Sequence, residues 1–254
     1  MDQVIAGLDM KIVAVTVAVA MLLAWGIGTW MGQRLRRRGD TKPSKFDDGS
    51  MALLGLLLAF TFGVSISKHD QRRITVLADS NAIGDFYTCA TLLREPTRTN
   101  LQAVIRQYVE LRLDLARRQI SYSDLDSALV RFKEMHARMT ELVGQALIDG
   151  TPIAVSLTNT LNEVISNHAS RLAAVRDHLP GSVLMLLFVC ASVTAMLIGR
   201  EQGIAASSEI AGTVCFIVLA SVAIYVILDL NRPDRGLIRV SQEPIEQLLS
   251  SMPK

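Results

Sequence analysis

Four long stretches without Asp, Glu, Lys or Arg constrain this chain more than any other feature. A helix needs about 20 residues to cross the ~30 Å hydrocarbon core of a bilayer, and each stretch is of that order. Backbone polar groups in lipid must be satisfied within the segment, so the stretches are expected to be helices rather than strands. Charged residues border each one. The four predicted spans are Ile12–Gln33, Gly49–Ser67, Leu179–Gly199 and Ile210–Leu228.

Composition supports a polytopic membrane protein with one modest soluble part. Half of the 254 residues are hydrophobic and the formal net charge is only +2. Four such runs in so short a chain do not suit the core of a soluble protein. Only 5% of residues are aromatic and no basic stripe interleaves with them, so nucleic acid is not an expected partner. Acidic residues precede the first span and arginines follow it, which favours a retained anchor over a signal peptide.

Between the second and third spans the charges are frequent and nearly balanced, and apolar residues recur with helical periodicity. The pattern predicts a soluble helical bundle over residues 68–178. Its last helix, which starts near Thr151-Pro152, is expected to continue without a break into the third span. The predicted fold class is therefore an all-α membrane protein. Residues 1–67 hold two spans and a basic loop, 179–230 hold the other two spans, and 231–254 form a surface turn and a short amphipathic helix.

Small residues recur at every fourth position in three of the spans. In lipid such faces allow helix backbones to approach closely and gain dispersion contacts. Packing within one subunit is the favoured interpretation, and an interface between subunits is the alternative. The three series are Ala20, Ala24, Gly28 and Gly32; Gly55, Ala59, Gly63 and Ser67; and Ala191, Ala195 and Gly199.

No motif of an enzyme, a metal site or a cofactor site occurs in the chain, so we expect neither catalysis nor a cofactor. The spans lack the titratable groups that pumps and proton-coupled carriers need. His168 lies on the apolar face of a predicted helix, where a hydrogen-bonded core role is favoured over a ligand role. Asp79 and Asn81 are polar residues in an otherwise apolar stretch just beyond the second span. A bundle hydrogen bond and a functional role both remain open for them.

Three segments resemble a bacterial family of four-span proteins called bestrophin-like. They are LLGLLLAFTFGVSISKHDQRR at the second span, ADSNAIGDFY after it, and LDLNRPDRGLIRVSQEP after the fourth span. The resemblance covers most of the chain from Met51 onward. Asp79 stands where the family is expected to have Glu, and Asp234 where an aromatic residue is common. The family-like polar positions are Asp79, Asn81, Asp229, Arg232, Pro233, Gly236, Ser241 and Pro244.

The resemblance implies kinship with oligomeric bestrophin anion channels, whose constriction lies on the second span. It therefore implies a homo-oligomeric channel for small ions in which the second span is nearest the pore. The candidate constriction residues are Leu56, Phe60, Phe62, Val64 and Ile66. The alternatives are that these side chains face lipid or neighbouring helices, and that the protein is a membrane-anchored sensor or scaffold whose insert binds a protein or ligand.

The basic residues of the first loop, from Arg34 to Lys45, form the densest cluster of positive charge between spans. The positive-inside rule places such a loop in the cytoplasm. We therefore expect a multi-pass protein of the bacterial inner (cytoplasmic) membrane whose helical insert lies on the outer side. Beyond the fourth span, Ser241 is expected to cap a short helix that either lies in the membrane interface or docks on the bundle.

Overall fold

The computed structural model describes residues 10–39, 46–117, 122–206, 209–231 and 238–253, and within these ranges all regular structure is helical. Four of the helices are long and apolar enough to cross a membrane, which confirms the predicted fold class. The chain divides into two compact units. The membrane unit comprises residues 1–68, 178–232 and 236–238, and the insert unit comprises 69–177, 233–235 and 239–254.

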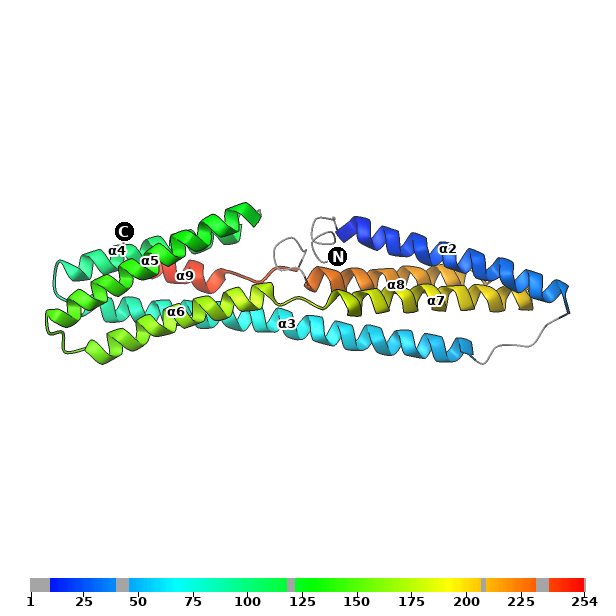
Figure 1. Cartoon of the computed structure of the whole chain (residues 1–254), viewed down its shortest axis with the longest axis horizontal. Helices are drawn as coiled ribbons and strands as arrows, with labels where there is room; N and C mark the ends of the chain where they lie inside the picture. The colour runs from blue at the N-terminus through cyan, green and yellow to red at the C-terminus, as the bar shows by residue number, and fades with distance from the viewer. Residues whose placement is uncertain (1–9, 40–45, 118–121, 207–208, 232–237, 254) are drawn as a thin grey trace. The chain divides into compact units, whose positions relative to one another are not determined.

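The membrane unit is built from α2 (Met10–Arg37), the first part of α3 (Phe46–Thr91), α7 (Gly181–Ala205) and α8 (Ile210–Leu230). Helices α2, α7 and α8 lie side by side (Figure 1). Their inward residues form an apolar core, while their outer faces carry exposed aliphatic side chains, as a lipid-facing surface requires. The core includes Val17, Met21, Leu54, Leu187, Ala191, Ala195, Ile217 and Ile224.

Glycines bring the backbones of α2 and α7 into direct contact. A Cβ atom on Gly28 would overlap the carbonyl oxygen of Met196, and one on Gly199 would overlap that of Trp25. Gly32 and Gly203 approach the opposite helix in the same way. Packing within one subunit, the interpretation favoured for the small-residue series, is therefore confirmed for these two helices.

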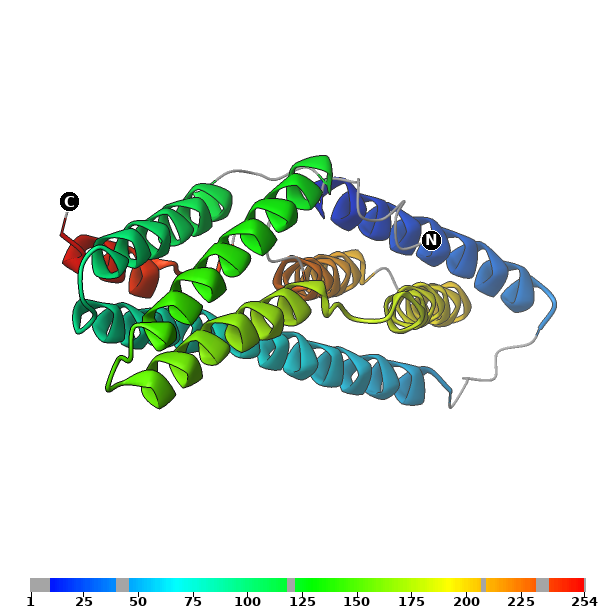
Figure 2. The same ribbon diagram turned by 60° about the vertical axis from the view of Figure 1, so that its left-hand side comes forward.

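The insert unit consists of the later part of α3 with α4 (Thr97–Arg117), α5 (Tyr122–Ile148), α6 (Ala154–Arg176) and α9 (Glu243–Ser251). Figure 2 shows α4, α5 and α6 as successive helices of a bundle. The helical periodicity predicted from the sequence corresponds to a buried face on α4, which includes Leu101, Tyr108 and Leu111. The core contains Ile83, Phe86, Leu101, Ile105, Tyr108, Phe132, Met139, Leu157 and Leu161.

The expected continuity between the last bundle helix and the third span is wrong. Helix α6 ends at Arg176 and α7 begins at Gly181, with Pro180 as its N-cap residue. Proline has no N–H to donate and disfavours helical conformation in the residue before it, so the chain is extended here. The freed N–H of Leu179 instead donates to Oδ1 of Asn231 at 2.7 Å.

The C-terminal helix α9 docks on the bundle, which decides between the two placements expected for it. Ile245 is fully buried in the insert core, and the side chains of Leu248 and Leu249 pack against that core. The Ser80 hydroxyl donates to the carbonyl oxygen of Pro244 at 2.9 Å. The expected cap at Ser241 is wrong, because Gln242 is the N-cap residue and forms no side-chain capping bond. Ser241 lies one residue earlier, and its Oγ accepts a hydrogen bond from the N–H of Glu243 at 3.2 Å.

Candidate functional site

The predicted constriction residues of α3 all have exposed side chains. Phe60 is the most open, at 65% exposure, and Leu56, Phe62, Val64 and Ile66 are also exposed. The opposite side of the helix packs inward, where Leu54, Thr61 and Ser65 are buried. Thr61 and Ser65 satisfy their hydroxyls by donating to backbone carbonyls within α3, so the inward side carries no free hydroxyl group.

The exposed residues of α3 form two groups rather than one. At about 100° per residue, Phe60 and Phe62 point roughly 200° apart around the helix axis. Leu56, Phe60 and Val64 therefore line one flank, and Phe62 and Ile66 line the other. Between the two flanks run Gly55, Ala59, Gly63 and Ser67, all exposed. No atom lies within 4 Å of where a Cβ on Gly55 or Gly63 would be placed. We call this combined surface the α3 outer face.

A buried charge cluster occupies the insert unit. The carboxylate of Asp79 is 0% exposed and bridges two guanidinium groups. Arg112 Nη2 donates to Asp79 Oδ1 at 3.0 Å, and Arg171 Nη1 donates to Oδ2 at 3.0 Å. Helices α3, α4 and α6 each contribute one of these three residues, so the cluster ties the three helices together. We name it, with Tyr108, His136 and His168, the Asp79 cluster.

Nη2 of Arg112 carries two hydrogens and has three acceptors close to it, Asp79 Oδ1, the Tyr108 hydroxyl and His168 Nδ1. Arg112 Nη2 lies 2.9 Å from Nδ1 of His168 and 2.7 Å from the hydroxyl of Tyr108. An arginine N–H can only donate, so Nδ1 of His168 is the acceptor in this contact, which corresponds to the neutral tautomer with its proton on Nε2. His136 Nε2 and the Tyr108 hydroxyl are 3.2 Å apart. The two histidine rings meet edge to face, with centroids 4.9 Å apart.

The surroundings of the cluster disfavour further positive charge. Two guanidinium groups and one carboxylate leave an excess of one positive charge among the three ionised residues. Burial, reinforced by the charge of Arg112, lowers the pKa of His168 to about 3 and also lowers the pKa of His136. Burial raises the pKa of Tyr108 to about 12. At neutral pH the rings of Tyr108, His136 and His168 are therefore neutral, and they lie next to the ion pairs of Asp79 with the two arginines.

The C-terminal segment completes this network. Arg171 Nη2 donates to Oε1 of Gln242 at 2.7 Å, and Gln242 Nε2 donates to the Val240 carbonyl oxygen at 3.1 Å. The residue directly before α9 is thus bonded to the same guanidinium that holds Asp79. Among the residues that the structure describes, no three His, Cys, Asp or Glu side chains converge as metal ligands would.

The other family-like positions are dispersed. Asn81 is exposed on α3. Asp229 is buried in the membrane unit, where Oδ2 accepts a hydrogen bond from the N–H of Ile238 at 2.9 Å. Arg232, Pro233 and Gly236 lie outside the described residues. For Asp79, the bundle hydrogen bond considered from the sequence is present, in the form of two ion pairs.

Reasoning from the sequence missed the two arginines of the cluster. Arg112 follows Tyr108 by four residues and Arg171 follows His168 by three, so each shares a helix face with a residue of an apolar seam. A charged residue in register with a buried seam is the signal that identifies them. His168 is a hydrogen-bonded residue at the edge of the core, as favoured from the sequence.

Four apolar helices and a separate helical insert define a multi-pass membrane protein in contact with the lipid bilayer. Comparison with protein families gives a specific assignment. A bestrophin-like domain matches residues 14–245, and the chain belongs to this bestrophin-like family. Neither the curated proteins nor the solved structures contain a match to the chain.

The lowered pKa values of the two histidines predict that acid destabilises the insert unit. In the unfolded chain His168 takes up a proton near pH 6.5, whereas in the folded chain it does so only near pH 3. Stability is therefore complete above pH 6.5 and falls between pH 6.5 and pH 3. For one fully shielded histidine the free energy of unfolding falls by about 2 kcal/mol from pH 7 to pH 5. Partial exposure of His168 reduces this loss to about 1 kcal/mol.

Thermal unfolding of the full chain in detergent, followed by far-UV circular dichroism at several pH values, checks this prediction. His168→Gln should flatten the dependence between pH 7 and pH 5, and His69→Gln, outside the cluster, should leave the slope unchanged. Equal slopes in the wild type and His168→Gln would refute the role given to His168.

Proposed function

We propose that this protein is a homo-oligomeric channel for small ions in which α3 lies nearest the pore. Membership of the bestrophin-like family supports a channel-like role. The observation that carries the proposal is the α3 outer face. The glycines of α2 and α7 are already engaged with each other, whereas the matching series on α3 is open. A small-residue face gains dispersion contacts only against another helix, so a second subunit is the partner that it favours.

In such an oligomer the two flanks of the α3 outer face have different surroundings. If Gly55, Ala59 and Gly63 pack against a neighbouring subunit, only one flank can face the axis. Phe60 is the most exposed aromatic residue of α3, so we assign its flank, with Leu56 and Val64, to the pore. A ring of such side chains forms an apolar constriction that can gate by dewetting.

Planar-bilayer conductance of purified protein tests the assignment. Phe60→Ala should widen and wet the constriction and raise the open probability or single-channel conductance several-fold. Leu219→Ala, which shortens an equally exposed side chain on α8, is the matched control and should leave conductance unchanged. Phe62→Ala tests the other flank. An effect of Phe62→Ala without one of Phe60→Ala would reverse the assignment of flanks.

A membrane-anchored sensor is the second candidate, and the Asp79 cluster favours it. The cluster links three helices of the insert to the C-terminal segment, and burial lowers the pKa of both of its histidines. A protein that shows no ion flux in the wild type or in Phe60→Ala, across the conditions tried, would favour this function over the channel.

The proposal includes an orientation in the bacterial inner membrane. Arg34, Arg36, Arg37 and Arg38 end the first span, and the positive-inside rule places them in the cytoplasm with the helical insert outside. Trypsin added to intact spheroplasts should then cleave the insert at exposed residues such as Arg138 and leave the first loop protected. Cleavage confined to the loop would contradict the orientation.

A further inference from the structure

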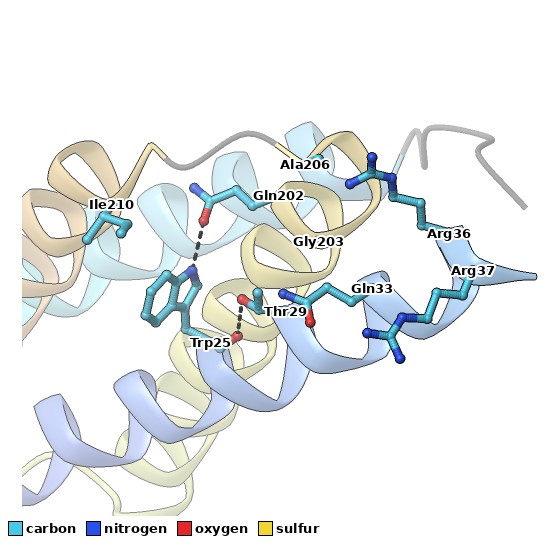
Figure 3. Close-up of a pocket in the computed structure, with 9 residues that line it drawn as sticks. All are labelled: Trp25, Thr29, Gln33, Arg36, Arg37, Gln202, Gly203, Ala206 and Ile210. Carbon is cyan, nitrogen blue, oxygen red and sulfur yellow. Dashed lines mark hydrogen bonds between the residues drawn. The ribbon is translucent and has the colours of Figure 1, made fainter.

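A cavity with both polar and apolar lining residues lies in the membrane unit, at the end of the first span. Its volume is about 650 Å³, within the range of roughly 300–1,000 Å³ typical of small-molecule sites. Helix α2 supplies one wall, α7 the next, and Ile210 at the start of α8 contributes an apolar edge (Figure 3). The lining residues are Trp25, Thr29, Gln33, Arg36, Arg37, Gln202, Gly203, Ala206 and Ile210.

The inner wall of this cavity is held by a chain of hydrogen bonds. Trp25 Nε1 donates to Gln202 Oε1 at 2.9 Å, as Figure 3 shows, and Gln202 Nε2 donates to Thr213 Oγ1 at 2.6 Å. Gly203 lines the cavity without a side chain because its backbone is in contact with α2 at Thr29. The helices cannot be drawn closer or moved apart here without disturbing that contact, so the cavity is part of the packed structure.

The charged residues that line the cavity are both arginines. Arg36 and Arg37 contribute two guanidinium groups, and none of the nine lining residues is acidic. Neither arginine forms an ion pair with another residue that the structure describes. The amide of Gln33 lies between Thr29 and Arg37, whereas Gln202 lies beside Trp25 (Figure 3). Guanidinium groups and neutral amide donors are the groups that proteins use to bind phosphate oxygens.

The position of the cavity along the chain indicates which phosphates can reach it. Trp25 lies within the first span and the arginines follow at its charged end, the level at which lipid headgroups meet the protein. We propose that the cavity binds the phosphate group of an anionic ligand through Arg36 and Arg37. A phospholipid headgroup and free inorganic phosphate share this chemistry. The inference does not depend on the channel function.

Native mass spectrometry of the detergent-purified full chain, titrated with phosphatidylglycerol, tests the lipid source. Arg36→Gln/Arg37→Gln should weaken retention of phosphatidylglycerol by about tenfold or more, because it removes two charge-assisted contacts. The matched control is Arg34→Gln/Arg38→Gln, which removes the same charge from the same helix end outside the cavity. It should weaken retention by no more than about threefold, in keeping with a general surface-charge effect.

Titration calorimetry of the delipidated chain with inorganic phosphate tests the soluble source. Binding that Arg36→Gln/Arg37→Gln abolishes supports the site with free phosphate as ligand. Trp25→Phe keeps both charges and removes the N–H that holds Gln202, so it should weaken the bound ligand several-fold and lower stability by no more than the loss of one hydrogen bond. The proposal is overturned if the two double variants lose phosphatidylglycerol equally, or if neither ligand binds in a manner that depends on Arg36 and Arg37.

Discussion

Replacing Asp79 by alanine is expected to lower the free energy of unfolding of the insert unit by about 3–5 kcal/mol. The carboxylate is fully buried and accepts hydrogen bonds from Arg112 and Arg171. Its removal leaves two guanidinium groups facing each other in a poorly hydrated interior with no opposite charge. That penalty exceeds the loss of an ordinary hydrogen bond, because both arginines are themselves largely buried.

Chemical denaturation of the full chain in detergent measures this effect. Asp85→Ala removes a carboxylate from the same helix at an exposed position, so it should change stability by less than about 0.5 kcal/mol. Asp79→Ala/Arg171→Met should recover part of the loss, since it removes one of the unpaired charges. If Asp79→Ala proved as stable as Asp85→Ala, the cluster would not stabilise the bundle.

Replacing Gly28 by valine is expected to break the packing of α2 against α7. A side chain there would occupy the position of the Met196 carbonyl, which is rigid backbone and cannot move aside alone. The helices must separate, and the contacts at Gly32, Gly199 and Gly203 are lost with them. We expect a cost of about 3 kcal/mol or more, at the upper end of the range for overpacking.

Gly26→Val provides a control on the same helix. No atom lies within 4 Å of the Cβ position at Gly26, so valine there adds only apolar surface toward the outside. Thermal inactivation in detergent, followed by size-exclusion chromatography, should place Gly26→Val close to the wild type and Gly28→Val far below it. Similar midpoints for the two variants would mean that α2 and α7 do not rely on backbone contact.

Gly28 and Asp79 show that the two units of the chain are stabilised by different interactions. In the membrane unit there is no hydrophobic drive between helices, so close approach through glycine supplies dispersion energy instead. In the insert unit water is the solvent, apolar burial dominates, and a buried charge is tolerated only because it is paired. The cavity that Arg36 and Arg37 line lies at the charged end of the first span, where the hydrocarbon environment ends.

Much of the candidate site could not be predicted from the sequence, before the packing of the helices was known. Leu56, Phe60 and Phe62 were predicted as candidate constriction residues of the second span, but which side of that helix is buried was known only from the structure. Asp79 attracted attention as a polar residue in apolar surroundings, whereas its partners lie 33 and 92 residues further along the chain. Spacing within one helix carries no information about such distant partners.

By itself the sequence determined that this is a four-span helical protein with a helical insert, because hydrocarbon admits only long, uncharged, internally bonded helices. Local periodicity was sufficient for that conclusion, and also for the seams of the bundle. Only the tertiary structure decided that the glycines of α2 and α7 are paired with each other while those of α3 stay open, and that Asp79 joins two arginines. Those outcomes depend on which helix faces meet, and faces meet through contacts between residues far apart in the chain.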